Sequence, residues 1–243
     1  MISLGRLIST TPIPVAGNIC FHQPRIIQVL DMGEQMYWGL LKIWDLERKE
    51  LIPEENEYTS TLSDYEVWML VMFGSPVMAE RLKASVDCFL HTKIEFLSIS
   101  GTIIVGEGDE SSCLLDENFY NTMKDICRSL SELGSEQKEE QYKETKNMSE
   151  REKQLIERMK ASAQKLDKIK NGERDTKNRL VKQIISLVAI GRYTFDEVYQ
   201  MTIVQLIYLL KKYVEIQQYE LYSNLSPYMD SKKTEPPKHW LDT

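Results

Sequence analysis

The sequence predicts an α+β fold that is mostly α-helical, with an N-terminal α+β domain carrying short β-hairpins and a helical C-terminal domain. Apolar residues recur at helical spacing through most of the chain, whereas short alternating segments occur only in its first half. A charged stretch without apolar periodicity separates the two parts. The predicted divisions are an N-terminal domain over residues 1–134, a charged linker over 135–148, a helical domain over 149–226 and an extended tail over 227–243.

The chain opens with a predicted strand pair and a helix. Apolar residues on both sides of the turn at Ala16-Gly17-Asn18 predict two short strands. Pro24 then stands where a helix favours its first residue, since proline lacks the N–H that would be unpaired there. Apolar residues from Ile26 to Trp44 recur at helical spacing, so we expect a helix that runs past Gly33.

Two helices and a second hairpin are predicted next. Ser63 with Glu66 has the spacing of a capping box, and the apolar helix that it opens should be buried. Ser75-Pro76 opens another helix, which should end near His91. The strands on either side of Ser100-Gly101 alternate between apolar and polar residues, but the alternation slips once at Phe96-Leu97. A β-bulge or burial of both faces would explain the slip.

Asp116 is expected to cap a helix through Leu130, before Gly134. After the linker, Ser149 with Glu152 forms a second capping box, which opens a charged helix with a thin apolar stripe. The residues of this stripe are Leu155, Met159, Leu166 and Ile169. A narrow stripe on a long charged helix packs either on its own domain or on a partner helix, and both readings stay open.

Three more helices complete the C-terminal part. Asp175 can cap the next helix, which should stop at Gly191 and carries the apolar residues Leu180, Ile184, Leu187 and Val188. Thr194 should then open a short helix from Phe195 to Tyr199. Thr202 with Gln205 then caps the longest apolar helix of the chain, to about Tyr222. Tyr213 and Tyr219 on this helix could form a stacking platform, but packing in the core or on a partner is favoured.

Composition and motifs exclude several classes of function. The 243 residues carry a net charge of −7, which argues against nucleic acid or an anionic membrane as partner of the whole chain. The four cysteines form no CxxC pair, and Cys88 with His91 supplies only two of the four ligands of a zinc site. No catalytic motif, apolar leader segment or spanning segment is found. We therefore expect a soluble protein that is not an enzyme and holds no cofactor or metal.

The C-terminal part resembles a known family. The residues that carry the resemblance are Arg174–Leu180, the apolar run Ile184–Val188, the stretch Phe195–Leu206 with its Met201-Thr202-Ile203-Val204-Gln205-Leu206 turn, and Pro236-Pro237-Lys238-His239-Trp240. In order and spacing they resemble the tail assembly chaperones of tailed bacteriophages, which are encoded just ahead of the tape measure gene in phages of Gram-positive hosts. The N-terminal strand–turn–strand, followed by Gln23-Pro24 and a helix, also fits this family.

The resemblance implies a non-enzymatic protein of the host cell cytoplasm that binds the phage tape measure protein and recruits tail tube subunits. The N-terminal domain would coat the tape measure protein or self-associate. The predicted partner-binding residues are Leu155, Met159, Leu166, Ile169, Tyr213 and Tyr219. Two alternatives stay open: a structural virion protein of the neck, tail or baseplate, and a small hydrolase or phage protein that acts on host defence. Absence from purified particles would favour the chaperone over the structural protein.

Overall fold

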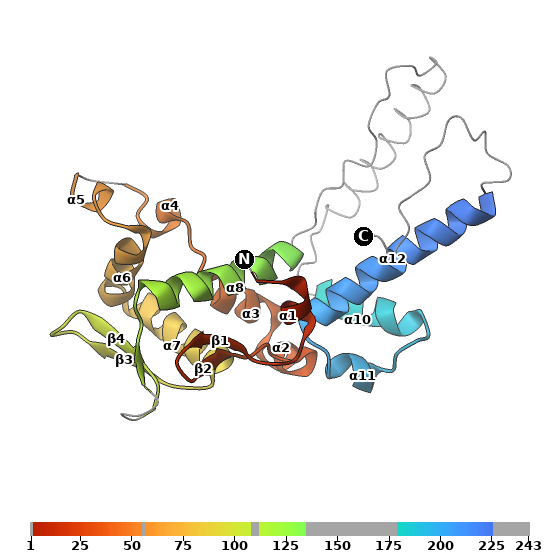
Figure 1. Ribbon diagram of the computed structural model, residues 1–243, viewed down its shortest axis with the longest axis horizontal. Helices are drawn as coiled ribbons and strands as arrows, with labels where there is room; N and C mark the ends of the chain where they lie inside the picture. Colours follow the sequence, from red (N-terminus) through yellow and green to blue (C-terminus); the bar gives the residue numbers. More distant parts are fainter. Residues whose placement is uncertain (1, 55–56, 108–111, 135–178, 226–243) are drawn as a thin grey trace, which may run out of the picture.

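The computed structural model describes residues 2–54, 57–107, 112–134 and 179–225. Within these ranges the chain is mostly helical, with two small antiparallel sheets in the N-terminal half, which confirms the predicted α+β class (Figure 1). The elements in chain order are α1 (Leu4–Ile8), β1 (Ile13–Ala16), β2 (Ile19–Phe21), α2 (Ile26–Met32), α3 (Glu34–Lys42), α4 (Arg48–Leu51), α5 (Glu57–Ser60), α6 (Asp64–Gly74), α7 (Pro76–Leu90), β3 (Ile94–Leu97), β4 (Thr102–Val105), β5 (Cys113–Leu114), α8 (Glu117–Gly134), α10 (Arg179–Ala189), α11 (Phe195–Tyr199) and α12 (Ile203–Leu225).

Both predicted hairpins form, and the second one has no bulge. β3 pairs with β4 in continuous antiparallel register from Ile94↔Val105 to Leu97↔Thr102, so the explanation by a bulge was wrong. Phe96 and Leu97 are both half-buried, which agrees with the other explanation, partial burial of both faces. The structure adds the short strand β5, which pairs with β4.

The expected helix from Pro24 through Trp44 is two helices. It begins at Ile26 rather than at Pro24, and it is broken at Gly33, which separates α2 from α3. Gly33 has a φ of 91°, a conformation that is open to glycine and strained for residues with a Cβ. Apolar spacing alone did not predict the break because both helices bury apolar residues in the same core.

The core contains a pair of tryptophans whose indole N–H groups both have acceptors. Trp44 and Trp68 stack with ring centroids 5.4 Å apart. The Trp44 indole N–H donates to Ser85 Oγ at 2.8 Å, and that of Trp68 donates to the Ile43 carbonyl at 2.8 Å. Buried polar groups are thereby satisfied, as a tightly packed core requires.

The predicted helix caps at Ser63, Asp116, Thr194 and Thr202 are confirmed, whereas the predicted capping box of Ser149 and Glu152 and the predicted cap at Asp175 lie outside the described residues. Ser63 and Glu66 form the capping box of α6, and the N–H of Gln205 donates to Thr202 Oγ1 at 3.3 Å at the start of α12. Asp116 Oδ1 accepts from the N–H of Phe119 at 2.8 Å, which caps α8. Each cap joins residues only three positions apart, so the starts of these helices could be predicted from the sequence.

The helices α10, α11 and α12 pack directly on the N-terminal part of the chain, and one apolar core extends through both (Figure 1). The N–H of Ile26 donates to the Met201 carbonyl at 2.8 Å, beside an isolated antiparallel bridge between Arg25 and Thr202. Gln205 Nε2 donates to the Ile8 carbonyl at 2.9 Å. The predicted division at residues 134 and 149 stays a prediction, but residues 179–225 and the N-terminal part share a common interior.

Candidate functional site

α12 carries the candidate partner-binding surface. Its first two turns lie in the core, where Leu206 is fully buried and Ile203 is 4% exposed. Further along, the helix extends away from the body, and Val214 is 51% exposed (Figure 1). One helix therefore combines an anchored start with an outward segment that still carries apolar side chains.

The apolar residues of α12 form one continuous stripe. Ile203, Ile207, Leu210 and Val214 follow one another at spacings of four, three and four residues, so they lie along one face of the helix. We call these four residues the α12 stripe. Exposure increases along it, from the buried Ile203 and Ile207 through the half-buried Leu210 to the exposed Val214. Apolar residues at alternating spacings of three and four are typical of a helix that packs against another helix.

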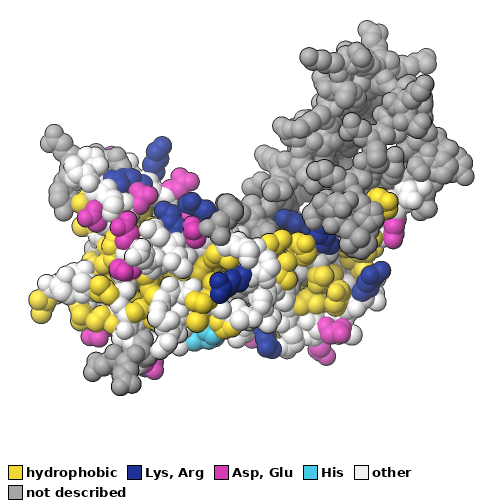
Figure 2. Space-filling view, in the orientation of Figure 1, with side chains coloured by type: hydrophobic (Ala, Val, Ile, Leu, Met, Phe, Trp, Pro, Cys, Tyr) yellow, Lys and Arg dark blue, Asp and Glu magenta, His cyan; other side chains and the backbone are white. Residues whose placement is uncertain are grey.

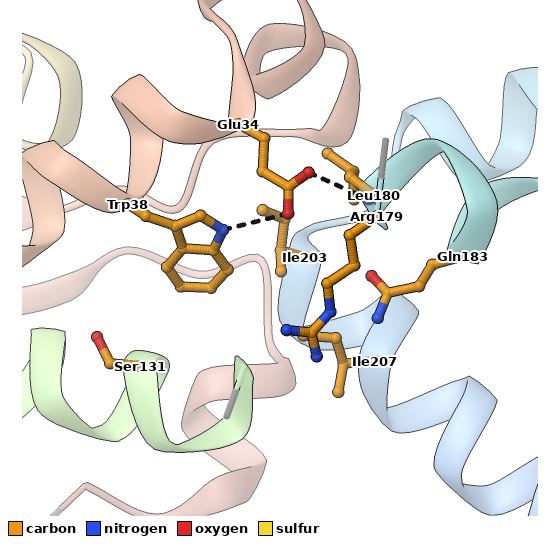
Figure 3. A pocket seen from close by; sticks show the side chains of 8 residues that line it. All are labelled: Glu34, Trp38, Ser131, Arg179, Leu180, Gln183, Ile203 and Ile207. Carbon is orange, nitrogen blue, oxygen red and sulfur yellow. Dashed lines mark hydrogen bonds between the residues drawn. The ribbon is translucent and has the colours of Figure 1, made fainter. Parts of the chain in front are cut away.

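A pocket lies at the base of the α12 stripe, between α3, α8, α10 and α12 (Figure 3). Its volume is about 260 Å³. Figure 3 shows the Trp38 indole on one side, Ile203 and Ile207 across from it, and the Arg179 side chain extending from α10 toward Ile207. The lining residues are Glu34, Trp38, Ser131, Arg179, Leu180, Gln183, Ile203 and Ile207.

Glu34 closes one side of this pocket by joining two helices. Its Oε2 accepts from the backbone N–H of Leu180 at 3.1 Å, and its Oε1 accepts from the Trp38 indole N–H at 3.4 Å (Figure 3). The carboxylate thus lies at the N-terminal end of α10, where the helix dipole favours a negative charge. It fixes the orientation of Trp38 and the start of α10 together.

The pocket is suited to an uncharged apolar group. Glu34 and Arg179 bring one negative and one positive charge to its lining, so the charges of these two side chains offset each other. A charged ligand group would lose its hydration there without a net gain from these two residues. Trp38, Ile203 and Ile207 offer apolar contact instead.

The predicted partner-binding residues fall in two places. Tyr213 and Tyr219 lie on the outward part of α12 and are half-buried. Leu155, Met159, Leu166 and Ile169 lie outside the described residues. No local pattern in the sequence identifies the pocket, because its walls come from α3, α8 and the α10–α12 region, which are far apart in the chain. The spacing of the α12 stripe was, however, visible in the sequence.

The histidines and cysteines do not assemble a metal centre within the described part of the chain. His22 and His91 stack with ring centroids 4.4 Å apart, but no group of three or more potential ligands is found among the described residues. Burial, with a smaller effect of Asp87, raises the pKa of the Cys88 thiol to about 11.

Apolar side chains are exposed across one face of the molecule. Figure 2 shows them from the end with β3 and β4 to the end with α12, and charged side chains lie at both ends, over α4 and α6 and near α11 and α12. None of the helices in the described ranges has the length and apolarity needed to cross a membrane.

No family model, curated protein or solved structure matches this chain.

Proposed function

We propose that this protein is a non-enzymatic phage tail assembly chaperone that binds a helix of the tape measure protein and recruits tail tube subunits in the host cytoplasm. The α12 stripe is the observation that carries the proposal. An apolar row that begins in the core and continues onto an outward helix suits pairing with a second amphipathic helix. The resemblance of the C-terminal sequence to tail assembly chaperones supplies the identity of the partner.

The geometry favours a binding protein in a second respect. The start of α12 is held by the Thr202–Gln205 cap and by the contact of Gln205 with Ile8, so the outward segment extends from a fixed base. A fixed base reduces the conformational entropy lost when a partner binds. A chaperone that holds an apolar helix in solution needs this combination of anchored support and accessible apolar side chains.

The test is co-expression with a phage tape measure protein, followed by a pull-down. Val214→Glu places a charge on the α12 stripe and should weaken capture, while the melting temperature stays close to that of the wild type. Ile185→Glu is the matched control, because Ile185 on α10 is also 51% exposed but lies outside the stripe. Equal capture by both variants would contradict the assignment of the surface. Failure of the wild-type protein to capture the tape measure protein would contradict the function.

A structural virion protein stays the second candidate, since an outward apolar helix could equally join subunits of a particle. The two functions differ in where the protein ends up. The chaperone should be present in lysates during tail assembly and absent from purified particles, whereas a structural component should be retained at fixed stoichiometry.

A further inference from the structure

The pocket at the base of the α12 stripe has the size and lining of a subsite for one side chain. Pockets for drug-sized ligands and cofactors span about 300–1,000 Å³, and the volume here is about 260 Å³. A single aromatic or branched apolar side chain therefore fits the space better than a nucleotide or a larger cofactor.

We infer that this pocket binds an uncharged, bulky apolar side chain, aromatic or branched, projecting from the partner helix that lies along the α12 stripe. This inference rests on the proposed function for the identity of the partner, but the pocket itself can be tested separately. Ile203 and Ile207 belong both to the pocket lining and to the stripe, so the two surfaces are continuous. A helix packed on the outward end of the stripe, at Leu210 and Val214, would thus present one of its own apolar residues to the pocket at the other end.

The chemistry of the lining selects an uncharged group. Both oxygens of the Glu34 carboxylate already accept hydrogen bonds, from Leu180 and Trp38, so the indole is held as a fixed wall. Arg179 brings the opposite charge from α10. A neutral aromatic ring can stack on or meet the edge of Trp38 and contact Ile207, whereas an ammonium or carboxylate would be desolvated beside a charge of its own sign.

The direct test uses indole as a neutral probe of the full chain, followed by NMR of the Trp38 indole N–H and the methyl groups of Ile203 and Ile207. We expect saturable shifts of these signals with indole and much smaller ones with tryptamine and indole-3-acetate, which carry opposite charges. Shifts that do not saturate, or that are equal for all three probes, would overturn the inference.

Ser131→Trp should fill the pocket from α8 and abolish the response to indole. Asn121→Trp is the matched control, because Asn121 is an exposed neutral residue of the same helix outside the pocket lining. Both variants should melt close to the wild type. A response to indole that persists in Ser131→Trp would place the probe elsewhere and overturn the inference.

The same pair of variants separates this inference from the proposed function. If the wild type captures the tape measure protein, Ser131→Trp should weaken capture and Asn121→Trp should not. Capture that is unaffected by Ser131→Trp would overturn the anchoring role and leave the chaperone function intact. Specific indole binding without any capture by the wild type would support an apolar subsite. The same result would contradict the proposed function and therefore the identity of the partner.

Discussion

The carboxylate of Glu34 accepts a hydrogen bond from the backbone N–H of Leu180 at 3.1 Å, across a separation of 146 residues. Glu34 is the first residue of α3, and Leu180 is the second residue of α10. The first N–H groups of a helix lack partners within the helix. A side chain of the N-terminal part therefore completes the start of a C-terminal helix, and the two parts stabilise each other.

Removal of this carboxylate should destabilise the protein. Glu34→Ala leaves the N–H of Leu180 without its acceptor, and loss of a helix cap costs about 0.5–2 kcal/mol. We expect a decrease of that size in the free energy of unfolding, measured by urea denaturation. Glu80→Ala is the control, because Glu80 pairs with Lys83 at the surface, where such pairs contribute at most about 1 kcal/mol. An equal effect of both variants would contradict the capping role.

Leu206 and Leu210 should differ in their contribution to stability. Leu206 is fully buried, and replacing a buried leucine by alanine costs about 2–5 kcal/mol. Leu210 is half-buried, so Leu210→Ala should cost clearly less. Thermal melts of the two variants test this difference. Equal melting temperatures would mean that the outward part of α12 is as well packed as its start.

Tyr213 and Tyr219 should affect binding rather than folding. Each is partly exposed on the outward part of α12, where a partner can contact it. We expect Tyr213→Ala and Tyr219→Ala to melt close to the wild type and to capture less tape measure protein in a pull-down. Normal capture by both variants would shift the assignment to the predicted helix that carries Leu155 and Ile169.

Stability should fall at mildly acidic pH because of the stacked histidines. Burial, and then the charge of His91, lower the pKa of His22 below 6.5. The unfolded chain then binds a proton at a higher pH than the folded protein does, so the stabilisation is complete above pH 6.5 and is lost as the pH falls through the lowered pKa. Denaturation curves across this range should show the decrease.

The variant His91→Asn isolates the contribution of the neighbouring charge. His91 has a φ of 52°, and asparagine tolerates this left-handed conformation better than most residues do. We expect the pKa of His22, measured by NMR, to rise toward its ordinary value without reaching it, because burial still acts. An unchanged pKa would show that the two rings do not interact electrostatically.

Limited proteolysis should separate two fragments that remain bound to each other. The stretch over residues 135–148 has no apolar periodicity, so we expect the first cleavage there. Because the apolar core extends from the N-terminal part into α10 and α12, the fragments should co-elute in gel filtration until denaturant is added. First cleavage between residues 20 and 130, or immediate separation of the fragments, would contradict this expectation.

Local signals in the sequence predicted the elements well. Capping residues such as Ser63, Thr194 and Thr202 identified helix starts because their side chains bond only three residues ahead. The break at Gly33 was missed because apolar spacing continues across it. The short helix α1 and the strand β5 were also missed, since very short elements form mainly through contacts with the rest of the fold.

The candidate site was predictable only in part. The spacing of the α12 stripe is a property of one helix and can be read from the sequence. The pocket depends on contacts such as Glu34 with Leu180, and the docking of α12 depends on the pairing of Arg25 with Thr202. Such contacts join segments more than a hundred residues apart, and no local pattern specifies them.

The ends of α8 and α10 meet at the same pocket, which Ser131 and Arg179 line together. The chain therefore leaves the described body and returns to it at almost one point. The entropic free-energy cost of closing a loop grows slowly with its length, by about 0.6 kcal/mol for each doubling. Because the end of α8 and the start of α10 lie at the same pocket, we expect that the number of residues between them can change at a small cost in stability while both helices keep their positions.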